Sequence, residues 1–447
     1  GCAAEGDPRG TRESPPGSRP RGGPNPLPIH LVCHNCRLPY LFATLPGRPS
    51  TDPSREVPIR SGPRLVTPAF GLVGLATLVY FAAIGTLLPV FPRYVRGPLR
   101  GGNLLVGLAV GSFSFGALVL RPWVGRLGDR RGRRLLLMVG AAVVSLSLVG
   151  YVIATTLALL ILFRVLGGLG EALFFVGAAS AITDLAPDRR RAEAMSLFSL
   201  AVFGGLSVGP MLGEAVLAGS GFRSVWLAAA AGAMIAAAVS LAVPETRPAS
   251  PRTKAPLADD LASASSRPRL LHPAALLPGG VLLASVAGLT AFNAFVPLYA
   301  LEIGLAGSRF VFLTFSVIAL SIRSLGARLP DRLGVVRSAR IALACSTAGL
   351  ATIALWRGPE GLFAGAAVFS LGQALAFPAL MSLAMRGAPD AERGAVVSTF
   401  TGFFDLAYGA GALGLGAVAA LLGYRGSFLA AASLAAAGLL VLRRCAK

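Results

Sequence analysis

About twelve apolar stretches follow one another between residues 69 and 442, and each is long enough to cross a lipid bilayer. A membrane-spanning helix needs about 20 mostly apolar residues, and it satisfies its own backbone hydrogen bonds, which lipid cannot do. The sequence therefore predicts an all-α integral membrane protein with twelve transmembrane helices. The expected spans are 69–92, 103–124, 135–155, 157–183, 195–218, 223–243, 275–300, 308–327, 339–356, 361–385, 394–421 and 426–442.

Two polar segments lie outside these spans. Residues 1–66 are rich in Pro, Gly and Arg and lack periodicity, so we expect a disordered leader. The first methionine is Met138, so we expect translation to start near Leu65 or Val66, without the leader in the mature protein. Residues 245–273 are expected to form a cytoplasmic linker. It would join an N-terminal half at 67–244 to a C-terminal half at 274–447.

The placement of charge predicts how the chain crosses the membrane. Only 14% of the residues are charged and the net charge is +21, yet most basic residues occupy short gaps between spans. This is the positive-inside pattern, so we expect a multi-pass inner (plasma) membrane protein with both termini cytoplasmic, and no nucleic-acid partner. The first gap is an exception because it holds Arg93, Arg96 and Arg100. The basic gaps that set the orientation lie at 126–134, 189–191, 247–269, 328–340 and 386–393.

Several kinds of chemistry are excluded by the residues available. Neither lysine, Lys254 or Lys447, follows the glycine pattern of a P-loop, and the three histidines lie outside the apolar spans. Cys33 and Cys36, with two nearby histidines, resemble a zinc site only superficially, so the disordered-leader interpretation is favoured. We therefore expect no enzymatic activity, no cofactor and no metal.

A charged stretch, GRLGDRRGRR at residues 125–134, has a shorter echo, ARLPDRLG, at residues 327–334. The two aspartates are 202 residues apart, and the same offset aligns LGEALFF at 169–175 with LGQALAF at 371–377. It also aligns GFRSVWL at 221–227 with GYRGSFL at 423–429. The offset also pairs Pro187 with Pro389, and matches of Asp, Arg and Pro in one register indicate a repeat. The two six-helix halves are therefore expected to be repeated units that bind substrate between them, near the bilayer midplane.

GRLGDRRGRRLLL resembles the signature loop between helices 2 and 3 of the major facilitator superfamily. RVLGGLGEA, residues 164–172, resembles the family's helix 4 motif, with Gly167 where many members have Gln. GLSVGPMLGE, residues 205–214, resembles the helix 5 motif of proton-coupled antiporters, with Glu214 in place of its last glycine. Together the motifs place residues from about 67 to 442 in this family, and the antiporter motif favours export.

The signature loop is expected to act as a gate. The resemblance implies that Asp129 meets the amino end of helix 11 near Arg393, where the helix dipole favours a carboxylate by about 0.3–1 kcal/mol. Asp331 with Arg191 would be the mirror contact. Positive-inside anchoring accounts for several of the loop arginines but not for an acid. The expected gating residues are Gly125, Asp129, Arg130, Gly132, Arg133, Asp331 and Arg332.

The helix 5 motif spaces its glycines four residues apart on one face. We favour close helix packing over a direct substrate role for them. Pro210 can kink the helix without a functional reason. The expected packing residues are Gly205, Gly209, Pro210 and Gly213.

Charged residues inside the spans are the sharpest functional signal, because intramembrane charge normally faces a cavity or a partner. They are absent from spans 3, 6, 9 and 12 except at the ends, so these four spans should face lipid. Arg164 and Glu171 are about two turns apart on one helix, and Glu171 is the first candidate for a coupling proton site, with Asp405 second. A static ion pair remains an equal alternative. The expected coupling and cavity residues are Arg121, Arg164, Glu171, Asp405, Asn293 and Gln373.

Three classes of function remain at this point. The favoured one is a monomeric secondary transporter that exports small organic molecules with the proton as coupling ion. The alternatives are a proton-coupled symporter that imports a metabolite, and a sensor or scaffold that uses the fold without transport. The expected cavity is mostly Ala, Leu, Phe and Gly, which suits an amphipathic or apolar substrate. For Asn293 and Gln373, interhelical hydrogen bonding is as acceptable as contact with substrate.

Overall fold

The computed structural model describes residues 65–187, 190–246, 272–325, 333–386 and 393–445, and these residues form helices with short connections. They belong to one compact unit, Ser61–Lys447. The expected leader and linker lie almost wholly outside the described residues. The helical elements are α1 (Pro68–Arg96), α2 (Asn103–Arg131), α3 (Arg133–Ile153), α4 (Leu157–Leu185), α5 (Arg191–Leu241), α7 (Pro273–Glu302), α8 (Arg309–Leu325), α10 (Val335–Leu355), α11 (Pro359–Arg386) and α12 (Arg393–Cys445).

Two of these elements, α5 and α12, are each two helices joined at a glycine. With 51 and 53 residues they would each be more than about 75 Å long if straight, over twice a bilayer core. Gly221 (φ 79°, ψ −179°) breaks α5, and Gly423 (φ 72°, ψ −178°) breaks α12. The two breaks are 202 residues apart. If the two limbs of α5 and the two limbs of α12 are counted as separate crossings, the ten described elements give the predicted twelve helices.

Helix ends follow from local sequence. Thr67 caps α1 by accepting a hydrogen bond from the N–H of Phe70 at 3.2 Å, and Pro68 fills the first turn. Gly132 (φ 97°) and Gly334 (φ 83°) precede α3 and α10 and also lie 202 residues apart. Because L side chains rarely adopt such φ values, glycine is required where the chain reverses at the signature loop.

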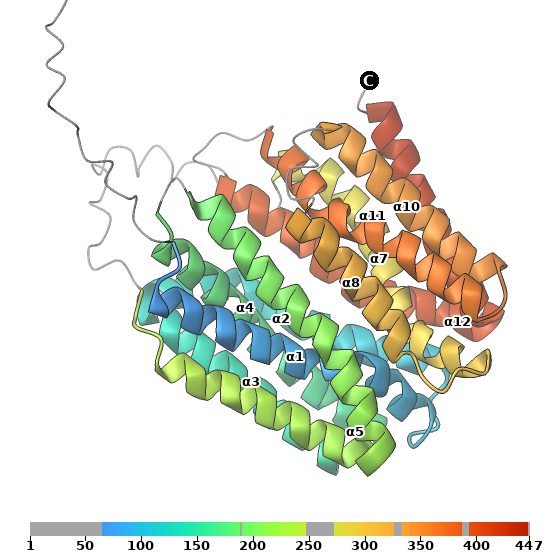
Figure 1. Cartoon of the computed structure of the whole chain (residues 1–447), viewed down its shortest axis with the longest axis horizontal. Coiled ribbons are helices and arrows are strands. Elements are labelled where there is room, and N and C mark those ends of the chain that lie inside the picture. The colour runs from blue at the N-terminus through green and yellow to red at the C-terminus, as the bar shows by residue number, and fades with distance from the viewer. Residues whose placement is uncertain (1–64, 188–189, 247–271, 326–332, 387–392, 446–447) are drawn as a thin grey trace, which may run out of the picture. The chain divides into compact units, whose positions relative to one another are not determined.

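The helices of residues 65–246 gather on one side in Figure 1, and those of residues 272–445 on the other. Within the first half α1 packs on α5, and α4 packs on α2 and α3; in the second, α7 packs on α12 and α11 on α10. The halves meet mainly where α2 packs on α12 and α5 on α8. The substantial contacts of α3 and α10, over the described residues, stay within their own halves, as expected for lipid-facing helices.

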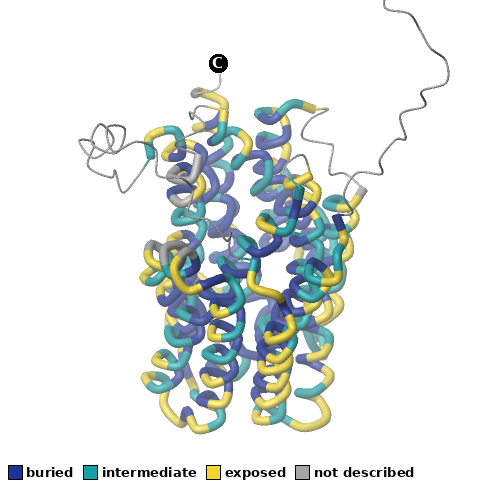
Figure 2. Tube along the Cα trace, turned by 90° about the vertical axis from the view of Figure 1, so that its left-hand side faces the viewer, coloured by how far each residue is buried: buried dark blue, intermediate teal, exposed yellow. Residues whose placement is uncertain are grey.

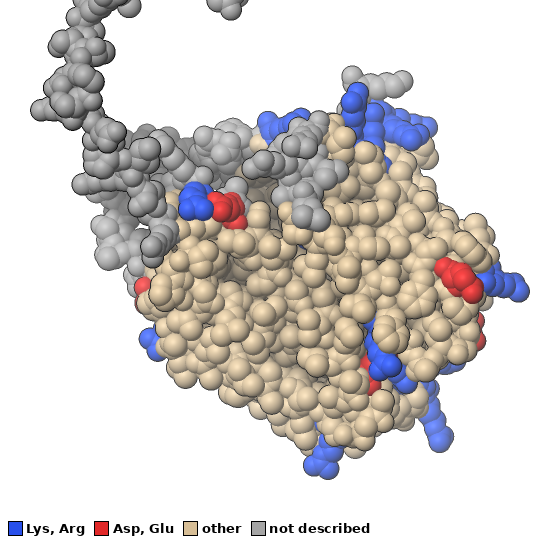
Figure 3. Space-filling model, viewed as in Figure 1, with Lys and Arg blue, Asp and Glu red and all other residues tan. Residues whose placement is uncertain are grey.

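The surface suits a lipid environment. Figure 2 shows exposed residues on the outward faces of the helices and buried residues between them. Figure 3 shows a broad uncharged belt with most charged side chains near its margins. By length and composition, nine elements of the described chain can cross a membrane, and α8, with 17 residues, is the remaining one.

Glycines bring α5 against α1. A Cβ at Gly205 would lie 2.6 Å from the carbonyl oxygen of Leu78, and one at Gly213 would lie 2.2 Å from that of Thr86. At Gly209 the added atom would lie 2.5 Å from the Cα of Gly85. These three residues are the spaced glycines of the helix 5 motif, so their geometry is that of close backbone packing. Pro210 lies inside the same helix.

Candidate functional site

Arg121 on α2 and Asp405 on α12 form an ion pair that joins the two halves. Nη2 of Arg121 donates a hydrogen bond to Oδ1 of Asp405 at 3.1 Å, and Nε lies 2.7 Å from Oδ2. The two side chains are 16% and 6% exposed, so the pair is largely removed from solvent. Removal of one partner of such a pair costs about 3–5 kcal/mol where no other charge compensates the ion that remains.

Glu171 on α4 is the second acid of this cluster. Its charge interacts electrostatically with Arg121 and with Asp405, so one guanidinium lies within range of two carboxylates. The same carboxylate also acts on Tyr80 of α1, whose hydroxyl is buried without a hydrogen-bond partner in the described part of the chain. The cluster therefore unites three helices of the first half with α12 of the second.

Arg164 does not act as the partner of Glu171. Its Nε donates to the carbonyl oxygen of Ala109 at 3.2 Å, and its Nη2 donates to that of Val110 at 3.4 Å. The guanidinium carbon lies 4.2 Å and 4.8 Å from the ring centroids of Phe91 and Phe113. The helical spacing places Arg164 and Glu171 on one face, but carbonyl and cation–π contacts draw Arg164 toward α2. Arg121 is the arginine that acts on Glu171.

The two candidate amides make hydrogen bonds between helices. Asn293 on α7 donates from Nδ2 to the hydroxyl of Tyr408 on α12 at 2.6 Å. Gln373 on α11 donates from Nε2 to the carbonyl and hydroxyl oxygens of Ser285 at 3.2 Å, and to Oγ of Ser346 at 3.3 Å. Gln373 thus ties α11 to α7 and α10, whereas Glu171, its counterpart in the repeat, has no such set of hydrogen-bond partners among the described residues.

The signature loop is described only in part. The helix α2 runs through Gly125 and Asp129, but the surroundings of these two residues lie outside the description, as do Asp331, Arg332 and the side chain of Arg393. Arg130 is exposed and has an interaction of its own. The expected contact between Asp129 and the amino end of α12, and its mirror at Arg191, therefore remain predictions.

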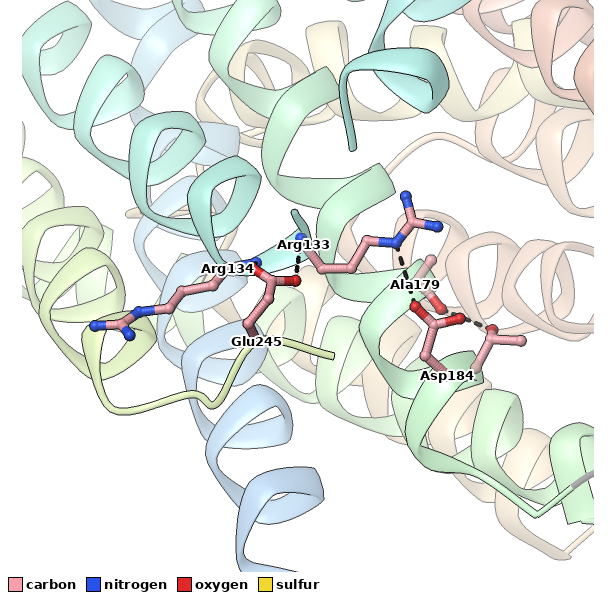
Figure 4. A network of polar contacts seen from close by, with 6 residues as sticks. Arg133, Arg134, Ala179, Asp184 and Glu245 are labelled. Atoms are coloured by element: carbon pink, nitrogen blue, oxygen red, sulfur yellow. Dashed lines mark hydrogen bonds and ion pairs between the residues drawn. The ribbon is translucent and has the colours of Figure 1, made fainter. Parts of the chain in front are cut away.

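Two acids hold the start of α3 at this loop (Figure 4). Glu245 accepts hydrogen bonds from the backbone N–H groups of Arg133 at 2.8 Å and Arg134 at 3.3 Å. Asp184 near the end of α4 accepts one from Nε of Arg133 at 3.2 Å. Carboxylates at a helix N-terminus are favoured by the free N–H groups and by the dipole. Arg133 thus has a structural partner in addition to any role in orientation.

The end of the bundle that holds this loop, where α2 ends and α3 begins, is called the signature-loop end below. Successive helices reverse direction, so α1 ends, α8 begins and the first limb of α5 (residues 191–220) ends at the other, opposite end. The first limb of α12 (residues 393–422) also ends there. The start of α2 lies at the opposite end as well.

Glu214 on α5 caps the N-terminus of α8 at the opposite end. Its Oε1 accepts hydrogen bonds from the N–H and the hydroxyl of Ser308, both at 2.8 Å, and its Oε2 accepts one from the N–H of Arg309 at 3.0 Å. Nη1 of Arg93 lies 3.9 Å from Oε1. Sequence reasoning placed Glu214 in the helix 5 motif and did not predict this contact. The replacement of the motif's last glycine by an acid was the available signal.

α2 and the first limb of α12 close the same end with backbone contacts. Nδ2 of Asn103 donates to the carbonyl oxygen of Ala419 at 2.9 Å. A Cβ at Gly107 would lie 2.1 Å from the carbonyl oxygen of Ala412, and one at Gly111 would lie 2.5 Å from that of Gly409. The opposite end is therefore closed between the halves in this structure.

Comparison with known proteins places the chain in a family. The model described as Major Facilitator Superfamily matches residues 73–412. An uncharacterised MFS-type transporter of Salmonella typhimurium is 28% identical over 384 residues, 83% of this chain and 94% of the relative. One from Burkholderia mallei is 29% identical over 373 residues, 81% of this chain and 88% of the relative.

Two solved structures share the fold. The human organic anion transporter MFSD10 superposes with a TM-score of 0.63 at 19% identity, over 84% of this chain and all of that one. A bacterial homologue of the lysosomal transporter Spinster, inward-facing and unoccupied, gives 0.68 at 16% identity, over 84% and 96%. These likenesses show the fold alone. With the twelve helices and the family match, they lead to one conclusion: the chain belongs to the major facilitator superfamily of multi-pass membrane transporters, which are not enzymes.

Proposed function

We propose that this transporter couples proton movement to the export of small organic molecules by alternating access. The observation that carries the proposal is the Arg121–Asp405 ion pair, because it is buried and crosses between the halves. A ligand shifts a conformational equilibrium only if it binds the two states differently. A proton on Asp405 removes the charge that holds Arg121, so it favours states in which the halves have separated at this point.

Glu171 is the acid that balances the charge of Arg121 when Asp405 is protonated. When Asp405 is protonated, Arg121 keeps a counter-charge in Glu171, which lies on the same half. The arginine is then neutralised within one half and no longer links the two. We therefore propose Asp405 as the proton switch and Glu171 as the acid that retains Arg121. This order reverses the one expected from the sequence, because the contact of Asp405 crosses between halves and that of Glu171 does not.

We propose that the signature-loop end faces the cytoplasm. Two of the three first-gap arginines, which are the exception to this orientation in the sequence, have local partners at the opposite end. Arg93 lies beside Glu214, and Arg96 donates to the carbonyl oxygen of Gly101 at 3.3 Å and interacts with Tyr424 of α12. They serve contacts at that end and need not be counted as orientation signals. On this proposal the closed opposite end is the external one, and the Arg121–Asp405 pair belongs to the state in which Asp405 is deprotonated.

Export is the direction that the helix 5 motif favours by its resemblance to proton-coupled antiporters. In such a cycle the external-facing state takes up the proton and the cytoplasm-facing state releases it. Release restores the Arg121–Asp405 pair that is present here. The test is transport of a panel of labelled compounds into and out of proteoliposomes under an imposed pH gradient. Movement of substrate against the proton flux supports export, and movement with it would indicate uptake.

A further inference from the structure

The repeat brings a second arginine to a matching place between the halves. Arg323 on α8 lies 202 residues after Arg121, and Phe203 on α5 lies 202 residues before Asp405. The guanidinium carbon of Arg323 lies 3.8 Å from the ring centroid of Phe203. The contact between α2 and α12 is thus repeated between α5 and α8, with a phenyl ring where the first contact has a carboxylate.

Arg323 carries a charge that the described protein does not neutralise. Its Nε is buried without a hydrogen-bond partner, and no ion pair engages it within the described residues. Arg323 as a whole is half-buried, and a cation–π contact contributes only about 0.5–2 kcal/mol, so its charge lacks the compensation that an ion pair would give. Arginines near helix ends can extend toward the membrane surface, but here the guanidinium lies on the ring of a helix from the other half.

The charged residues along the path between the halves add up to a net positive charge. Three arginines and two acids lie in the spans between the halves and away from the cap at the opposite end: Arg121, Arg164 and Arg323, with Glu171 and Asp405. Asp405 pairs with Arg121, and Glu171 lies near the same arginine. Arg164 is held by carbonyl oxygens and phenyl rings. An excess of one positive charge remains, and among these three arginines Arg323 is the one without a polar partner in the described part of the chain.

We propose that Arg323 binds the acidic group of an organic anion, a carboxylate or sulfonate, and that Phe203 packs against the apolar part of that molecule. This deepens the proposed function and rests on it, because it names the substrate class of the same path. The anion would take the place that the carboxylate of Asp405 holds in the matching contact. A planar guanidinium suits this task, since it can donate two parallel hydrogen bonds to one carboxylate.

The sharpest variant is Phe203→Asp, which installs the missing acid and supplies Arg323 with a resident counter-ion. The fold already accommodates such a pair at Arg121 and Asp405, so the variant should fold. Arg323→Gln removes the positive charge itself and therefore tests the same claim independently. Phe203→Asn is the matched control, since it removes the ring and adds no charge.

The experiment is the thermal stabilisation of purified protein in detergent by a fixed panel of probes. The anions are benzoate, naphthalene-2-sulfonate and octanoate; the neutral probes are benzamide and octanamide; the cations are benzylammonium and octylammonium. At least one anion should stabilise the wild type more than its matched amide or amine. Its apparent affinity should fall at least about tenfold in Phe203→Asp and in Arg323→Gln, and less in Phe203→Asn.

Three results would overturn the inference: stabilisation by amines or amides alone, anion stabilisation that persists in both variants, or no stabilisation by any anion. No pH gradient is present in this measurement, so it is independent of proton coupling. A neutral or cationic substrate that a pH gradient drives would leave the proposed function intact while removing this inference. Anion binding to the wild type, together with a lack of gradient-driven transport, would support this inference and contradict the proposed function.

Discussion

Glu214 on α5 accepts hydrogen bonds from both the backbone N–H and the hydroxyl of Ser308, the residue that precedes α8, at 2.8 Å each. The carboxylate is 6% exposed and belongs to one half of the molecule, while the helix that it caps belongs to the other. A carboxylate at a helix N-terminus gains from the free N–H groups and from the dipole. This contact therefore closes the opposite end only while the halves are together there.

Glu214→Ala should favour the conformation that is open at the opposite end. Hydrogen bonds to a charged group contribute about 1.5–3 kcal/mol each, so their loss should shift the population measurably. A cysteine introduced at Val311, which is fully buried in α8, reports the opening. We expect a thiol reagent to label it at least about fivefold faster in the Glu214→Ala background.

Glu302→Ala is the control for this measurement, because Glu302 is an exposed acid that ends α7 at the same end of the bundle. It should leave the labelling rate at Val311→Cys close to that of the parent. Equal rates in the Glu214→Ala and parent backgrounds would show that Glu214 is not a latch.

The kink glycines should resist replacement for conformational reasons. At Gly221 and Gly423 a Cβ would meet nothing within 4 Å, but their φ and ψ values belong to a region that is essentially restricted to glycine. Alanine at either position should destabilise the protein by about 1–3 kcal/mol. Gly219→Ala, also in open space but without a positive φ, should be neutral or slightly stabilising. Melting in detergent distinguishes them, and equal melting temperatures for all three variants would contradict the conformational account.

Topology can be read from Cys445 at the end of α12. If both termini are cytoplasmic, a membrane-impermeant thiol reagent should not label Cys445 in intact cells and should label it after permeabilisation. A Cys345→Ser background removes the cysteine of α10. Efficient labelling in intact cells would place the C-terminus outside.

Asp129 remains the predicted gating residue of the signature loop. Asp129→Asn should slow transport while expression and membrane insertion stay near normal, because it removes a contact that forms in one state only. Arg131→Ala should have a much smaller effect on the transport rate. Similar transport rates for the two variants would reduce the loop to a topology signal.

The sequence predicted the fold well because its two strongest signals are physical requirements. Apolar length fixes the spans, and the 202-residue offset pairs the kinks at Gly221 and Gly423 as well as the turns at Gly132 and Gly334. A single sequence carries no comparable signal for how far one helix is shifted along its neighbour or how it is rotated against it. For that reason the sequence paired Arg164 with Glu171, although the contacts of Arg164 are carbonyls of α2.

The same limit explains why the sequence did not predict the contact of Glu214 with the start of α8. Its partners lie 94 and 95 residues away and are mostly backbone N–H groups, which any sequence would supply. Arg121 and Asp405 were both named as cavity residues, but their pairing across 284 positions depends on how α2 and α12 register. Sequence reasoning thus found the charged residues, and the packing of the halves decided which of them meet.

Glu171→Gln provides the comparison for the coupling mechanism. The repeat carries Gln373 at the matching place, so the variant should fold. It leaves Arg121 without a counter-charge when Asp405 is protonated, so gradient-driven transport should fall. Substrate exchange without a gradient should survive. Gradient-driven transport at the wild-type rate would make Glu171 structural.

The most direct test of the account is Asp405→Asn in proteoliposomes, with gradient-driven transport and gradient-free substrate exchange measured on the same preparation. Asn keeps the shape of Asp405 but cannot change charge, so we expect exchange to persist while a pH gradient no longer accelerates or directs transport. Arg121→Lys, which retains the charge, should keep part of the coupling. Gradient-driven transport at the wild-type rate in Asp405→Asn would contradict the central claim that the Arg121–Asp405 pair couples the proton to the movement of the halves.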